Sequence, residues 1–147
     1  MPRRLARTYV DAQNGISMYQ TLKFVHISFA ILSIFGFVLR GFWMFKRSAI
    51  LDRLFIRIAP HVIDTAFLIS GIWLVVALQL RVMQHDWLIA KFIALILYVV
   101  FGAIALRRGR TMQARGMAFV AALLTYLYIV GVALNKSPAS WIAFVAG

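Results

Sequence analysis

Four segments of this 147-residue sequence are each about twenty residues long and hold almost no charged side chains. They run from about 21 to 45, 61 to 80, 87 to 106 and 116 to 134. A helix of about twenty apolar residues spans the ~30 Å hydrocarbon core of a bilayer, whereas a helix on a soluble domain needs a polar face toward water. The sequence therefore predicts an all-α fold, an integral membrane four-helix bundle.

The composition agrees with lipid as the surroundings of this chain. Hydrophobic residues make up 63% of the sequence and charged residues 14%, against roughly 45–50% apolar residues in ordinary globular domains. The net charge of +12 comes from lysines and arginines that crowd the ends of the apolar segments, as in membrane loops. We expect these residues to meet the bilayer and its anionic lipids, with no direct binding of nucleic acid.

The connection after the first span and the C-terminal tail carry signals of their own. Residues 48–58 have apolar and charged side chains at helical spacing but cannot span a bilayer, so we expect a short amphipathic helix in the interface between spans one and two. Ser48 is its expected N-cap, and Pro60 fits the first turn of the second span. The tail, residues 135–147, is expected to fold back to the interface.

The positions of the basic residues predict the domain organisation and the orientation. Residues 1–17 form a polar, basic extension, and residues 18–147 form a single four-span domain. Loops one and three lie on one side and hold nine basic residues, Arg40, Lys46, Arg47, Arg53, Arg57, Arg107, Arg108, Arg110 and Arg115. The opposite side holds five, Arg3, Arg4, Arg7, Arg81 and Lys136. Because the more basic loops stay in the cytoplasm, we expect a bacterial inner-membrane protein with both termini in the periplasm.

Ionisable residues within the spans are costly in lipid unless they face the bundle interior. Hairpin geometry places Arg40, late in span one, at the depth of His61 and Asp64, early in span two. His61 and Asp64 are three residues apart and share a helical face, and Arg40 is the expected counter-ion of Asp64. This inner cluster of Arg40, His61 and Asp64 either clamps two helices together or forms a proton or ligand site.

A second group of polar residues lies toward the other surface. His26 and Lys91 share one depth, and Tyr98 follows Lys91 on one face of span three, so these three residues form an outer cluster. In one interpretation His26 ligates haem iron and Lys91 binds a propionate. In a second, the pair binds a quinone carbonyl or another anion. In a third, His26 only bonds a neighbouring helix and Lys91 snorkels outward. His26 and His61 lie at opposite ends of their hairpin, so we do not expect both to ligate one haem.

These residues occur in motifs that closely resemble the SirB family of bacterial inner-membrane proteins, named as invasion gene expression up-regulators. The resemblance covers nearly everything from Met18 onward. Its motifs are Met18-Tyr-Gln-Thr-Leu-Lys-Phe-Val-His26, Leu39-Arg-Gly41, Pro60-His-Val-Ile-Asp64 with Gly71, and Trp87-x-x-x-Lys91-x-x-x-Leu95-x-x-Tyr98-x-x-x-Gly102, continuing into Ala105-Leu-Arg-Arg-Gly-Arg-Thr111. The resemblance implies four membrane spans and a link to virulence gene regulation that does not run through DNA binding. It carries over no reaction.

Two functional hypotheses follow from the sequence. In the first, the chain is a small inner-membrane protein whose buried polar site binds a redox cofactor or ligand, either haem or a quinone-like molecule, in a redox or regulatory role. In the second, it is a non-catalytic assembly or regulatory protein whose buried charges only lock the helix bundle. Its partner would then be a second copy of the chain or another membrane protein.

Overall fold

The computed structural model describes residues 2–79, 81 and 84–146. Within them the chain is helical: α1 (Pro2–Phe45), the short 3-10 helix η1 (Ala49–Asp52), α2 (Leu54–Ala77), α3 (Asp86–Ala103), the π-helical turn η3 (Ile104–Arg108), α4 (Met112–Asn135) and α5 (Trp141–Ala146). Four of these segments are long and apolar enough to cross a membrane. The predicted all-α membrane protein with four spans is confirmed.

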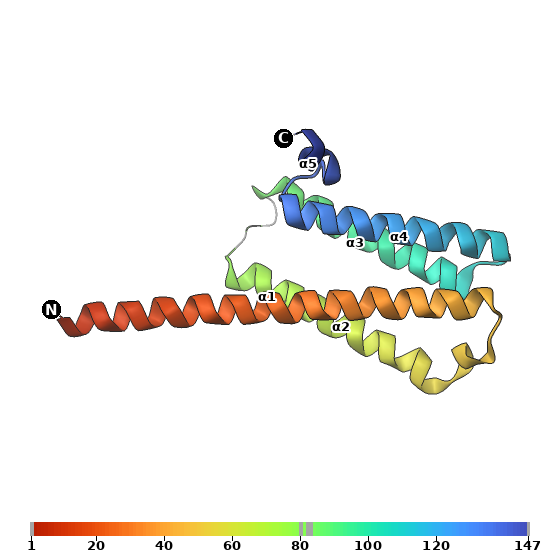
Figure 1. The fold of residues 1–147 in the computed structure, drawn as a ribbon, viewed down its shortest axis with the longest axis horizontal. Helices are drawn as coiled ribbons and strands as arrows, with labels where there is room; N and C mark the ends of the chain where they lie inside the picture. Colours follow the sequence, from red (N-terminus) through yellow and green to blue (C-terminus); the bar gives the residue numbers. More distant parts are fainter. Residues whose placement is uncertain (1, 80, 82–83, 147) are drawn as a thin grey trace.

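The four long helices form two antiparallel hairpins, α1 with α2 and α3 with α4 (Figure 1). The hairpins meet where the C-terminal half of α1 packs on η3 and α4. The core at this junction combines the ring of Phe37 with small residues, Ala105, Ala118 and Ala122. Small side chains allow helix backbones to approach closely, which is how helices associate in lipid. Most large apolar side chains elsewhere, such as Phe24 and Val62, are exposed, as expected of a surface that faces acyl chains.

Helix α1 is longer than the predicted first span. It contains 44 residues, or about 66 Å at ~1.5 Å per residue, roughly twice the ~30 Å hydrocarbon core. Residues 2–17, predicted as a polar extension, continue this helix without a break, and its N-terminal end projects well beyond the other helices (Figure 1).

A short helix does lie between spans one and two, but it does not extend over the predicted residues 48–58. Ser48 does act as a cap, since its hydroxyl accepts from the Ile50 amide at 3.3 Å, but the helix it starts is the four-residue η1. Arg53 is extended, with φ −66° and ψ 134°, and ends η1. Residues 54–58 are the first turns of α2, because their apolar pattern continues in phase with the span.

The earlier start of α2 also changes the position of Pro60. It lies inside the helix rather than in its first turn. A proline within a helix has no N–H to donate to the carbonyl four residues earlier. The carbonyl of Ile56 therefore lacks its usual helical partner, at the point where α2 runs past the C-terminal part of α1.

The ends of the second hairpin are closed by side chains. Arg115 reaches from α4 to the end of η3, where its Nε donates to the Ala105 carbonyl at 2.8 Å and its Nη2 to the Leu106 carbonyl at 3.0 Å. At the other end the tail folds back as predicted, because the Trp141 indole donates to the Leu127 carbonyl at 2.8 Å. The Arg115 contacts satisfy carbonyl groups at a helix end that helix geometry alone would leave without a partner.

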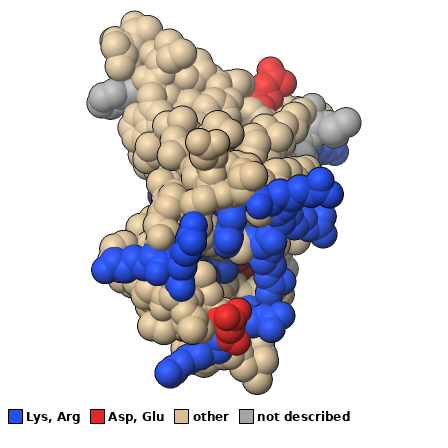
Figure 2. All heavy atoms as spheres, turned by 90° about the vertical axis from the view of Figure 1, so that its right-hand side faces the viewer, with Lys and Arg blue, Asp and Glu red and all other residues tan. Residues whose placement is uncertain are grey.

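The two basic loops lie at one end of the molecule, which we call the basic end. It holds the connection between α1 and α2 and the connection between η3 and α4. Viewed from this side, lysine and arginine side chains spread across much of the surface (Figure 2). Both termini lie toward the opposite end (Figure 1).

Candidate functional site

The shortest polar contact between α1 and α2 joins two side chains in the middle of the spans. The Ser33 hydroxyl donates to Asp64 Oδ1 at 2.5 Å, and Ser33 is only 7% exposed. A carboxylate in lipid is tolerated when its oxygens receive hydrogen bonds from within the bundle. Ser33 was not predicted as a site residue. The signal that identifies it is spacing, because His26, Ser33 and Arg40 are seven residues apart and so lie on nearly the same face of α1.

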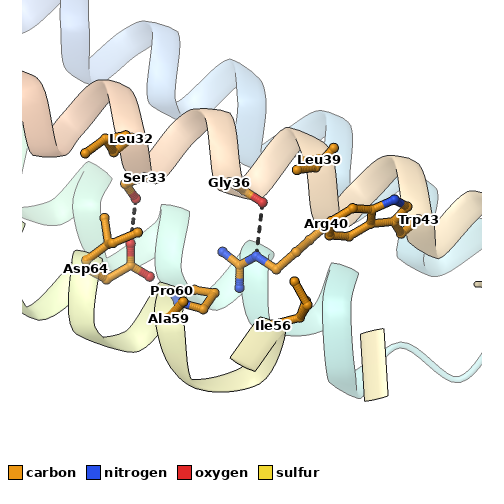
Figure 3. A pocket seen from close by; sticks show the side chains of 11 residues that line it. Leu32, Ser33, Gly36, Leu39, Arg40, Trp43, Ile56, Ala59, Pro60 and Asp64 are labelled. Carbon is orange, nitrogen blue, oxygen red and sulfur yellow. Dashed lines mark hydrogen bonds between the residues drawn. The ribbon is translucent and has the colours of Figure 1, made fainter. Parts of the chain in front are cut away.

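Arg40 does not form the predicted ion pair with Asp64. Its Nε donates to the Gly36 carbonyl of its own helix at 3.1 Å (Figure 3), and no hydrogen bond or ion pair joins it to Asp64 in the part of the chain that the structure describes. The physical reason is depth: Ser33, two turns earlier, already occupies the level of Asp64. Arg40 and Asp64 nevertheless line the same cavity without direct contact.

A cavity of about 110 Å³ lies between α1 and α2 beside these groups. We call it the α1–α2 cavity; it is lined by Leu32, Ser33, Gly36, Leu39, Arg40, Trp43, Ile56, Ala59, Pro60, Ile63 and Asp64. Most of the lining is apolar, and its charged groups are the Arg40 guanidinium and the Asp64 carboxylate (Figure 3). Leu32 and Leu39 are also exposed on the outside of α1, so the cavity opens toward the acyl chains.

Tyr98 belongs to this inner group and not to the predicted outer cluster. It packs edge-on against Phe37 of α1, with ring centroids 5.6 Å apart, and its side chain lies near Ser33. The seven residues from Lys91 to Tyr98 correspond to about 10 Å along the helix axis, which carries Tyr98 out of the Lys91 layer. Its neighbour Tyr126 donates to the Ala30 carbonyl at 3.3 Å. Tyr98 of α3 and Tyr126 of α4 thus contact α1 from the second hairpin.

His61 was predicted to belong to the inner cluster, but it lies outside it. Its side chain is exposed and does not line the α1–α2 cavity. Successive helical residues turn by about 100°, and the face of α2 that packs on α1 is centred near Ile63 and Phe67. Asp64 sits at one edge of that face, so His61, a further 60° or so around the helix, points outward. Lying on the same general side of α2 as Asp64 is therefore not sufficient to bring His61 into the inner cluster.

His26 binds α2 at the opposite level of the same hairpin. Its Nδ1 is 2.9 Å from the Ser70 hydroxyl, and its ring stacks on Phe67 with centroids 4.7 Å apart and planes 14° apart. A Cβ on Gly71 would lie 3.0 Å from His26 Cε1, so glycine permits this close approach. Lys91 faces the same region from α3 and interacts with His26 through its charge. His26 and His61 are far apart along the hairpin, as predicted.

The surroundings of His26 do not fit an axial haem ligand well. The Ser70 contact at Nδ1 leaves Nε2 without a protein partner among the described residues, but Phe67 covers one ring face and Gly71 lies against the Cε1 edge of the ring. The α1–α2 cavity and a second groove on α3 and α4 are both lined by other residues. Within the described residues no cluster of three histidine, cysteine or acidic side chains is arranged to hold a metal ion. The arrangement is that of a packed, hydrogen-bonded histidine.

Comparison with known proteins agrees with this organisation. The chain is 38% identical to Protein SirB2 of Salmonella typhimurium over 127 residues, which cover 84% of this chain and 96% of that protein. It is 35% identical to Protein YchQ of Escherichia coli K12 over 128 residues, or 84% and 98% of the two chains. A Haemophilus influenzae protein is 40% identical over 80 residues, 54% of this chain and 61% of that protein. No solved structure matches.

The family profile described as "Invasion gene expression up-regulator, SirB" matches residues 19–138. The match contains all four predicted spans and every residue of the inner and outer clusters, and it starts just after the predicted extension. The chain belongs to the SirB family.

Proposed function

We propose that this protein is a ligand-binding protein of the bacterial inner membrane and that the α1–α2 cavity binds the polar head of a quinone-like amphiphile. The observation that carries this proposal is the pairing of a guanidinium and a carboxylate in a cavity that is otherwise apolar and open to lipid. Ionisable groups in a membrane interior are costly and commonly mark functional sites.

The size and chemistry of the cavity support this ligand class. Its volume of about 110 Å³ approaches the ~150 Å³ of an engineered apolar cavity that holds benzene, so it suits a single ring. Arg40 has five N–H donors and uses its Nε on Gly36, which leaves donors for an oxygen of the ligand. Leu32 and Leu39 at the rim offer an apolar path for a lipid tail.

The orientation is part of the same proposal. The basic end holds most of the arginines and lysines of the loops (Figure 2), and such loops are retained in the cytoplasm. Both termini would then be periplasmic, and the α1–α2 cavity would lie in the cytoplasmic half of the bilayer. The basic end would also attract anionic lipid headgroups.

Quenching of tryptophan fluorescence tests the proposed ligand, because Trp43 lines the cavity. A short-tailed benzoquinone titrated into protein in detergent should give saturable quenching. The Trp43→Phe variant should lose most of it, whereas Trp73→Phe, which removes an exposed tryptophan of α2, should retain it. Quenching that does not saturate, or that is equal in both variants, would argue against the site. Extraction of quinone from the purified protein would be independent support.

A second candidate function has its own supporting observation. Two hydrogen bonds, Ser33 to Asp64 and His26 to Ser70, join α1 and α2 at two levels. In this candidate the polar groups only lock the hairpin, and the protein acts as an assembly or regulatory partner. The Arg40→Gln variant separates the two, since Arg40 makes no bond to another helix among the described residues. Both candidates predict unchanged stability for this variant. If the polar groups only lock the hairpin, neither the wild-type protein nor the variant binds quinone. If they form a binding site, the variant binds quinone more weakly than the wild-type protein.

A further inference from the structure

We propose that the α1–α2 cavity selects a hydroxyl-bearing, reduced ring over its oxidised form, so that its ligand class is a hydroquinone or another phenol. This inference rests on the proposed function and specifies the ligand of the same site. The order of hydrogen-bond donors and acceptors around Asp64 determines this selectivity.

The direction of the hydrogen bonds at Asp64 is set by Ser33. A serine hydroxyl has one proton to donate and two lone pairs to accept with. Ser33 directs its proton to Asp64 Oδ1 at 2.5 Å. This bond joins α1 to α2, and Asp64 is its acceptor.

The second oxygen of Asp64 points toward Pro60 and the α1–α2 cavity, while the guanidinium of Arg40 lies farther along the same wall (Figure 3). The carboxylate of Asp64, which already receives the Ser33 proton at Oδ1, only accepts hydrogen bonds. A ligand therefore meets an acceptor at Asp64 and donors at Arg40. A hydroxyl group on the ligand can donate its proton to Asp64, and an oxygen lone pair of the ligand can accept from Arg40.

An oxidised quinone does not match this pattern. Its carbonyl oxygens only accept, so one of them would face the Asp64 carboxylate without a proton between the two oxygens. A phosphate headgroup, which also presents acceptors, would meet the same repulsion. Because a hydrogen bond to a charged group that is left unmade weakens binding by about tenfold or more, the reduced ring should bind at least about tenfold more tightly than the oxidised ring.

The test compares three ligands with the same short tail by calorimetric titration in detergent under argon. They are a hydroquinone, the corresponding benzoquinone and the hydroquinone dimethyl ether, which keeps the ring but has no hydroxyl proton. We expect the hydroquinone to bind at least about tenfold more tightly than the other two. Equal affinities for all three would overturn the inference while leaving the proposed ligand-binding function in place. If none of the three ligands binds, the proposed function itself would be overturned.

A variant locates the preference at Asp64. Asp64→Asn keeps the size of the side chain but offers an amide that both donates and accepts, so the affinities for hydroquinone and benzoquinone should converge to within about threefold. The matched control is Thr65→Val, whose hydroxyl is exposed and donates only to the His61 carbonyl of its own helix. It should keep the wild-type preference. A preference that persists in Asp64→Asn would show that Asp64 is not its source.

Discussion

Replacement of Gly41 by alanine tests how tightly the two hairpins are joined. A Cβ built on Gly41 overlaps the ring of Phe119 from α4. That ring cannot easily turn away, because it stacks on Phe37 with centroids 5.1 Å apart and meets Phe45 edge-on at 5.7 Å. Overpacking of a well-packed core costs about 1–3 kcal/mol, so Gly41→Ala should lower the free energy of unfolding by this amount beyond any change in helix propensity.

Gly36→Ala is the matched control for this substitution. Gly36 lies five residues earlier in α1, and a Cβ there meets nothing within 4 Å. Both substitutions gain the same helix propensity, about 1 kcal/mol at most, so their difference isolates the clash. The free energy of unfolding can be measured for both from loss of helical circular dichroism as SDS replaces a mild detergent. Equal stability of the two variants would refute the packing of α1 on α4 described above.

Three further predictions use the same chain. Arg115→Ala should lower the free energy of unfolding by about 2 kcal/mol, because two carbonyls at the end of η3 lose a charged donor, whereas Arg110→Ala, at an exposed position, should be nearly neutral. Ser33→Ala should cost about 1–3 kcal/mol in the same assay, because Asp64 loses its donor; Ser28→Ala, whose hydroxyl bonds only to Phe24 of its own helix, should cost less. Since the sequence contains no cysteine, single cysteines report topology: an impermeant maleimide should label Ala139→Cys in intact cells and Gln113→Cys only after lysis, and the reverse pattern would invert the proposed orientation.

Much of the fold could be predicted from the sequence because lipid imposes a simple rule. Long apolar segments must be helices in a membrane, and all four predicted spans are found as helices. The details that failed depend on local backbone geometry instead. The extended conformation of Arg53 ended η1 after one turn, and this shifted the start of α2 and moved Pro60 into the helix interior. Charge and apolar spacing carry no signal for the conformation of that single residue.

The polar site was only partly predictable, for a related reason. Charged residues stand out in apolar spans, so Arg40 and Asp64 could be identified, and antiparallel pairing fixed their depth. Which side chains touch depends on rotation about each helix axis. A rotation of about 60° separates His61, which is exposed, from Asp64, which faces α1. Hydroxyl groups such as Ser33 are too common in membrane helices to stand out by composition.

The two candidate functions make different demands on the polar groups between α1 and α2. A lock requires that these groups be satisfied from within the protein, and Ser33 meets this requirement by donating to Asp64. A lock does not require Arg40 to line a cavity beside this bond, or the second oxygen of Asp64 to face the cavity (Figure 3). A guanidinium and a carboxylate kept in one lipid-facing cavity without a direct bond are costly in a bundle that needs only to stay closed. That cost is understandable if a third molecule completes the pair, which is why the geometry favours a site over a lock.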